Sequence, residues 1–197
     1  MEDSSRNTDI DRLLREVRAC TLCEEFLEDG VRPVLQLAPE ARILIAGQAP
    51  GRRVHESGVP FDDPSGERLR DWMGVTPAEF YDARKVAILP LGFCFPGSGR
   101  SGDLPPRLEC ARAWREALLE QLPALELTLV IGQYAIGWHG DGRKRSLTEV
   151  VRGWKAWGPS RVPMPHPSPR NNLWLRKNPW FEQEVLPHVR SRVGELL

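Results

Sequence analysis

The sequence predicts a three-layer α/β/α domain around a central, mainly parallel sheet of four strands. Short apolar segments of strand length alternate with segments whose apolar residues recur at helical spacing, and loops rich in Gly and Pro separate them. Strands that alternate with helices pair in parallel and are covered on both faces. The 197 residues suffice for one sizeable core, so we assign 1–197 to a single domain.

Six elements are predicted in the first half of the chain, from apolar spacing and from Gly, Pro and capping residues. They are a helix over 10–22 capped by Thr8 or Asp9, a strand over 41–46, a loop over 47–66, helices that begin at Ser65 and Thr76, and a strand over 85–91. Thr76 predicts a helix start because Pro77 follows it at the first helical position and Glu79 can complete a capping box.

The second half of the chain continues the alternation. It contains a loop over 95–106, an amphipathic helix over 109–122, a strand over 125–131, a short strand near 160–162, a Pro-rich turn over 163–169 and a terminal helix over 179–197. Sheets of this kind bind ligands beyond the carboxyl ends of their strands. Gln48, Cys94 and His166 each follow a predicted strand, so we expect their three loops to meet at one edge.

The composition excludes a membrane span and does not favour a strongly basic nucleic-acid binder. There are 27 basic and 27 acidic residues, and 23 of the basic ones are arginine, which grips phosphate with two hydrogen bonds. No apolar run is long enough to cross a bilayer, and the polar, acidic N-terminus is not a signal peptide. We therefore expect a soluble, cytoplasmic monomer, in a compartment where structural disulfides are rare.

The four cysteines fall into two spaced pairs, Cys20-x2-Cys23 and Cys94-x15-Cys110. Four thiolates from such pairs suit zinc or an iron–sulfur cluster. No histidine lies within either pair, which favours a ligand set of sulfur alone. Four separate buried thiols are the alternative, but they leave the spacing unexplained. Spacing alone leaves both zinc and an iron–sulfur cluster open.

Two motifs and the cysteine spacing together resemble a known superfamily. The first motif is Gly47-Gln-Ala-Pro-Gly51, followed by Pro60-Phe61 and Gly66, and the second is His166-Pro-Ser-Pro-Arg-Asn171. The first is similar to the motif of the family-four uracil-DNA glycosylases, and the second resembles the form found in single-strand-selective monofunctional glycosylases. The cysteine spacing is similar to that of the family-four enzymes, whose cysteines hold a 4Fe–4S cluster. All these features lie between Cys20 and Asn171, so the resemblance covers most of the chain.

This resemblance implies a uracil-DNA glycosylase-like fold and a monofunctional enzyme of base excision repair. Its substrate would be DNA with uracil or a related deaminated or damaged base, whose N-glycosidic bond it would hydrolyse. The cofactor would be a 4Fe–4S cluster, with zinc as the alternative. Its ligands would be Cys20, Cys23, Cys94 and Cys110.

The resemblance also implies roles for residues of both motifs. His166 would donate a hydrogen bond to the departing base as negative charge develops on it. Phe61 would stack on a base flipped out of the helix, with a core position as its alternative. Gln48 and Ala49 would lie against the base edge and the attacking water, and Gln48 would assist catalysis. Six residues would approach or clamp the DNA strand, namely Pro50, Gly51, Arg52, Ser168, Arg170 and Asn171.

Two positions depart from the family-four pattern. Gln48 stands where those enzymes carry glutamate, and an amide can orient a water but cannot take its proton. Pro90 stands where they carry an asparagine that reads uracil, which leaves the preferred base open. Nearby candidates to replace the glutamate are Asp62, Asp63, His55 and Glu56. The departures favour a second hypothesis, a non-catalytic protein that binds damaged DNA or a nucleotide; a redox or scaffold protein centred on the cluster is a third.

Overall fold

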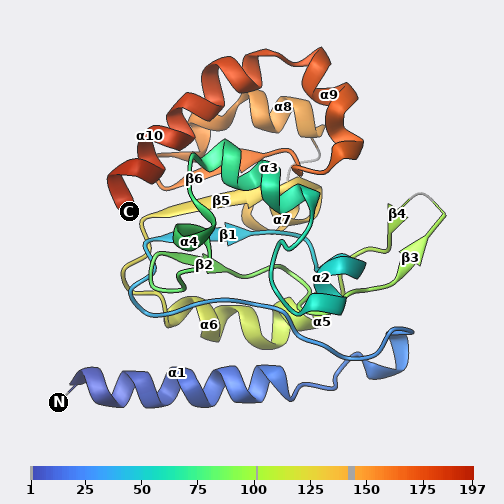
Figure 1. The fold of residues 1–197 in the computed structure, drawn as a ribbon, viewed down its shortest axis with the longest axis vertical. Coiled ribbons are helices and arrows are strands. Elements are labelled where there is room, and N and C mark those ends of the chain that lie inside the picture. Colours follow the sequence, from blue (N-terminus) through green and yellow to red (C-terminus); the bar gives the residue numbers. More distant parts are fainter. Residues whose placement is uncertain (1, 101, 142–144) are drawn as a thin grey trace.

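The computed structural model describes residues 2–100, 102–141 and 145–197. Its centre is a parallel sheet with the strand order β2-β1-β5-β6. The strands are β1 (Ile43–Ala46), β2 (Val86–Ile88), β5 (Leu127–Ile131) and β6 (Arg161–Met164). Helices cover both faces of this sheet, as Figure 1 shows, so the predicted three-layer α/β/α fold is confirmed.

The helices are α1 (Glu2–Arg18), α2 (Arg52–Ser57), α3 (Pro64–Met73), α4 (Pro77–Phe80), α5 (Leu108–Cys110), α6 (Glu116–Glu120), α7 (Gly132–His139), α8 (Leu147–Arg152), α9 (Asn172–Lys177) and α10 (Leu186–Leu196). One π-helical turn, Ala111–Arg115, joins α5 to α6, and another, Phe181–Val185, leads into α10. Within the described ranges, none of these helices is both long and apolar enough to cross a membrane.

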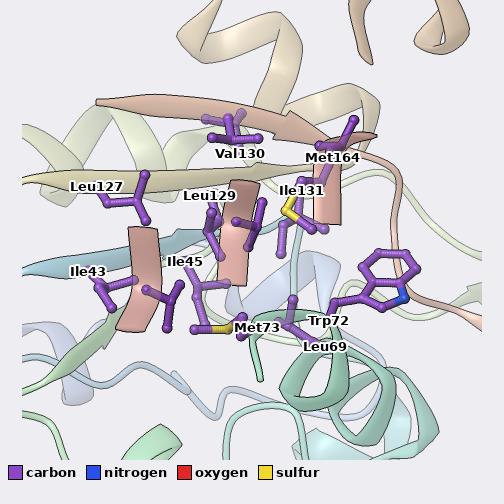
Figure 2. Packing of buried hydrophobic residues seen from close by; sticks show 14 of the residues in the cluster. Ile43, Ile45, Leu69, Trp72, Met73, Leu127, Leu129, Val130, Ile131 and Met164 are labelled. Carbon is purple, nitrogen blue, oxygen red and sulfur yellow. The ribbon is translucent and has the colours of Figure 1, made fainter. Parts of the chain in front are cut away.

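Alternate residues of the strands pack against opposite layers. Ile43 and Ile45 of β1 share a buried cluster with α3 and α10, and Figure 2 shows Leu69 and Met73 of α3 directed toward the sheet. Leu44 of β1 belongs to a second cluster with α1 and α6 on the other face. Burying each large apolar side chain contributes roughly 1.5–3 kcal/mol, so continuous apolar runs in the strands stabilise both layers at once.

Three predictions for the extent of a helix or loop were wrong. The first helix runs through Thr8 and Asp9 instead of beginning there, because no Pro or Gly interrupts its polar start, and it ends before Cys20. The loop predicted over 47–66 contains α2, which ends at Gly58 in the left-handed conformation with φ 74°. The loop predicted over 95–106 contains the hairpin of β3 (Ser98–Gly99) and β4 (Gly102–Asp103).

Pro163 lies inside β6, although the sequence analysis placed it in a turn. β6 is an edge strand that pairs only with β5, so a residue without an N–H is tolerated there. Thr76, in contrast, behaves as predicted. Its hydroxyl accepts from the backbone of Glu79, and the Glu79 carboxylate accepts from the Thr76 N–H, which forms the capping box of α4.

Candidate active site

The carboxyl ends of all four strands open into one cavity of about 660 Å³. Gln48 follows β1, Pro90 follows β2, Gln133 follows β5 and His166 follows β6, and all four line the cavity. From β1 the sheet extends to β2 on one side and to β5 and β6 on the other. The cavity therefore lies at the point where the strand order reverses, which is where open α/β sheets bind their ligands.

The cavity also gathers every predicted site residue apart from the cysteines. They are His166, Gln48, Ala49, Phe61, Pro50, Gly51, Arg52, Ser168, Arg170 and Asn171. Three loops were expected to converge. The loops of Gln48 and His166 bring their motif residues to the cavity, and the loop after β2 brings Pro90. Cys94 itself does not line the cavity, because it is buried in the cluster on the other face of the sheet.

The loop of Gln48 is fixed by its main chain. The N–H of Leu91 donates to the carbonyl of Gly47 over 3.1 Å, and the N–H of Gly92 donates to the carbonyl of Gln48 over 3.0 Å. These bonds extend the pairing of β1 and β2 past their ends. In the described part of the chain, the side-chain amide of Gln48 has no hydrogen-bond partner, so it is available to a ligand in the cavity.

Phe61 adopts a strained backbone conformation beside this loop. Its φ is 54°, a left-handed value that costs a non-glycine residue about 1 kcal/mol. A Cβ on Gly66 would lie 1.8 Å from the Phe61 carbonyl oxygen, and a Cβ on Gly47 would lie 3.8 Å from the ring. The ring also meets Phe80 edge to face, with centroids 6.1 Å apart. Phe61 is thus half-buried, with its ring packed between the core and the first motif.

His166 is held in one tautomer by the turn that carries it. The N–H of Ser168 donates to Nδ1 over 3.2 Å, so the proton of the neutral ring resides on Nε2. The side chain of Asn171 donates to the His166 carbonyl over 2.7 Å and fixes the turn. Burial lowers the pKa of His166, while the carboxylates of Asp63 and Asp103 act in the opposite direction. The net shift is downward, so the ring is neutral at pH 7.

Two of the predicted DNA-binding arginines occupy different environments. Arg52 forms an ion pair with Asp29 over 2.6 Å and lies 5.1 Å from the ring centroid of Phe95, so its guanidinium is already engaged. Arg170 lies against Gly102 of the β3–β4 hairpin, because a Cβ there would be 2.2 Å from Nη1. Of these two arginines, only Arg170 has no ion pair within the described ranges.

The four candidate substitutes for a glutamate at Gln48 are not equivalent. The Nε2 atom of His55 lies 3.1 Å from the carbonyl of Asp29. Glu56 and Asp62 line a second, polar depression instead of the main cavity. Asp63 does line the cavity, but its carboxylate accepts from the N–H of Gly66 over 2.9 Å and caps α3. None of the four is an unengaged carboxylate in the main cavity.

Gln133 and Asp103 are among the cavity residues that the sequence did not predict. Gln133 stands two residues past the end of β5, so the rule that ligands bind beyond strand ends could have found it. Asp103 lies at the end of β4 within a Gly-rich segment, and no pattern in the sequence predicts that this segment reaches the cavity.

The four cysteines form a set of free thiols away from the cavity. Cys23, Cys94 and Cys110 are buried and Cys20 is half-buried. Burial raises the pKa of Cys94 to about 11 and that of Cys110 to about 12, and the charges of the other cysteines in the set add to both shifts. The cysteines are therefore near one another. Even so, no group of three or more His, Cys, Asp or Glu side chains in the described ranges is arranged to hold a metal ion.

The sequence matches a known protein family and a known protein. A family model described as the uracil DNA glycosylase superfamily matches residues 35–190. A type-4 uracil-DNA glycosylase of Thermotoga maritima is 26% identical over 159 residues, which cover 77% of this chain and 78% of that protein. The segment matched by the family model includes both motifs, all four strands of the sheet and every residue that lines the cavity except Val34. The chain therefore belongs to the uracil DNA glycosylase superfamily.

Proposed function

We propose that the chain is a monofunctional DNA glycosylase that hydrolyses the N-glycosidic bond of uracil or a related deaminated base in DNA. The observation that carries the proposal is the neutral His166, held with its proton on Nε2 in the same cavity as Gln48 and Phe61. Membership of the superfamily and the printed name of the Thermotoga maritima relative support the same chemistry.

Breaking the glycosidic bond places positive charge on the deoxyribose and negative charge on the base. His166 donates from Nε2 to a base oxygen as that negative charge develops, and Phe61 stacks on the flipped-out base. The free amide of Gln48 orients the water that attacks the sugar. No lysine lines the cavity in the part of the chain that the structure describes, so water rather than an amine is the nucleophile.

The strand of DNA follows the two motif loops. Pro50 and Gly51 let a phosphate approach the backbone closely, and Arg170 with Ser168 clamps the strand on the other side. The carbonyl of Ser168 accepts from the Arg68 guanidinium over 3.2 Å, which ties this turn to α3. The turn that would clamp the DNA strand is therefore supported by α3. Its role in binding is separate from the role of His166 in base release.

The cysteines would hold a 4Fe–4S cluster, although the described side chains are not arranged around a metal ion; hydrogen-bond donors beside the sulfurs support this assignment. The indole N–H of Trp114 donates to Sγ of Cys20 over 3.3 Å. Backbone hydrogen bonds from Arg32 and Phe93 favour the thiolates of Cys94 and Cys110. Donors of this kind suit cluster ligands, whose sulfurs carry negative charge. A cluster would tie the segment after α1 to β2 and α5, and no step of base release passes through it.

A cleavage assay tests the proposal. Oligonucleotides containing uracil, hypoxanthine or xanthine, single- and double-stranded, are incubated with the protein, and abasic sites are then cleaved with alkali. We expect strand breaks with at least one of these bases and none with the unmodified oligonucleotide. Binding to a modified oligonucleotide without any cleavage would favour the non-catalytic hypothesis, for which Gln48 and Pro90 in the cavity are the specific observations.

A further inference from the structure

The β3–β4 hairpin brings a carboxylate to the cavity. The hairpin projects from the body of the molecule beside α2 (Figure 1), and Asp103 at its end pairs with Ser98. The N–H of Leu104 donates to the carbonyl of Gly97 over 2.9 Å and closes the base of the hairpin. Asp103 lines the cavity together with His166, Gln48 and the first-motif loop.

Asp103 lies where the two motifs meet. Its Oδ2 atom is 3.6 Å from the place where a Cβ on Gly51 would stand, so it contacts the end of the first-motif loop. The preceding residue, Gly102, is covered by the guanidinium of Arg170 from the second motif, and its φ of 140° is one that only glycine adopts readily. Burial lowers the pKa of His166, and the charge of Asp103 acts against that shift. The hairpin is thus docked on both loops.

The position is unusual for an acidic residue. The cavity has to admit a DNA strand, and a carboxylate beside the loops that approach phosphate weakens DNA binding by repulsion. Asp103 has no ion pair or hydrogen bond within the described ranges that would neutralise its charge, whereas Asp63 is committed to capping α3. A free carboxylate in this cavity stabilises positive charge. During base release, positive charge develops on the deoxyribose.

We propose that Asp103 is a catalytic residue of the glycosylase reaction, supplying from the hairpin the carboxylate that the first motif lacks at Gln48. The inference rests on the proposed function. As the glycosidic bond breaks, its electron pair leaves with the base and the Asp103 carboxylate stabilises the sugar cation. The water oxygen then bonds to C1′, one proton of that water passes to Asp103, and the residue returns it to solvent. The base anion takes its proton from solvent.

Substitution of Asp103→Asn tests this, because it keeps the size of the side chain and removes its charge at an exposed position. Single-turnover rates are measured with enzyme in excess over the best substrate of the cleavage assay. Binding is measured with the same oligonucleotide carrying a 2′-fluorinated nucleotide, whose glycosidic bond resists cleavage. We expect the rate to fall about a hundredfold, while binding is unchanged or up to about threefold tighter because a repulsive charge is gone.

The matched control is Asp62→Asn, which removes the same charge from the second depression; its rate should stay within about twofold of wild type. A wild-type rate in Asp103→Asn, or a rate loss matched by an equal loss of binding, overturns the role of Asp103 while leaving the proposed function intact. Absence of cleavage by the wild-type protein on every base overturns the proposed function and this inference with it.

Discussion

The N–H of Ser168 donates a hydrogen bond to Nδ1 of His166 over 3.2 Å, within the same Pro-rich turn. This bond needs an unprotonated Nδ1. Protonation of the ring would place two donors against each other and would break the arrangement that directs Nε2–H into the cavity. Burial lowers the pKa of His166 because it also disfavours the charged ring, so burial and the hydrogen bond from Ser168 favour the same neutral form.

The pH dependence of base release follows from this relationship. The pKa of His166 lies below its ordinary value of 6.5, so the neutral ring persists at every pH above that value. We expect the single-turnover rate to be constant above pH 6.5 and to fall only at lower pH. The folded state also binds fewer protons here than the unfolded state, so stability from His166 is complete above pH 6.5 and is lost as pH falls below it. A His166→Gln variant should lack this acid limb.

Replacement of His166 by alanine removes the donor to the departing base. We expect the single-turnover rate to drop about a hundred- to a thousandfold, the usual loss for one transition-state hydrogen-bond donor. DNA binding should change little, because the proposed function assigns those contacts to Arg170 and the backbone around it. Normal cleavage by His166→Ala would show that the assigned leaving-group role is wrong, even though the superfamily stands.

The sheet was predictable because its strands are buried on both faces. Ile43–Ala46 is a continuous apolar run and Leu127–Ile131 is one interrupted only by Thr128, and such runs are recognised without knowledge of their neighbours. Helix α7 was not predicted, because Gly132 and Gly137 give its sequence a low helical propensity and packing against β5 decides its conformation.

Some residues of the site were likewise predictable from the sequence and others were not. His166 and Gln48 belong to motifs whose residues are adjacent in sequence, so their shared cavity followed from the motifs and from the rule for strand ends. Asp103 shares their cavity only because the base of the hairpin lies against Gly51 and Arg170. That contact joins segments far apart in the chain, and no local pattern encodes it.

The cysteine set should prove essential for stability. Purified protein is expected to be brown, with iron at stoichiometric levels. Replacement of Cys110 by alanine should remove the iron and destabilise the fold by about 3 kcal/mol, which lowers the melting temperature by roughly 6–12 °C for a chain of this size. Leu118→Ala in the same helical run is the control, because it opens a cavity worth about 2–5 kcal/mol but should leave the iron bound. If the purified protein instead contains stoichiometric zinc and no iron, the cysteines form a zinc site and not an iron–sulfur cluster.

Pro90 offers a test of base selectivity. It lines the cavity at the end of β2, and its carbonyl accepts from the buried guanidinium of Arg115 over 3.1 Å, a contact that any residue at this position can keep. Pro90→Asn adds an amide where the family-four enzymes carry one. We expect kcat/KM for uracil relative to hypoxanthine to rise about tenfold, the worth of one added hydrogen bond. Pro96→Asn, elsewhere on the lining, should leave the ratio unchanged.

Gln48 and Asp103 both act on the sugar and its water in the proposed mechanism. Gln48→Ala should slow base release about tenfold to a hundredfold, because a water held by backbone carbonyls loses one orienting group. Gln48→Glu in the wild-type background should raise the rate, since a second carboxylate near the sugar also stabilises its positive charge.

The decisive variant combines Gln48→Glu with Asp103→Asn. If both positions act on the sugar and its water, a carboxylate at residue 48 replaces the one lost from the hairpin, and the double variant should recover at least about tenfold of the rate that Asp103→Asn loses. A rate in the double variant no higher than in Asp103→Asn would show that residue 48 faces the departing base, whose negative charge a glutamate would repel. Asp63→Asn completes the test: if it abolishes cleavage while Gln48→Ala does not, the water is activated from the start of α3, and the role assigned to Gln48 is wrong.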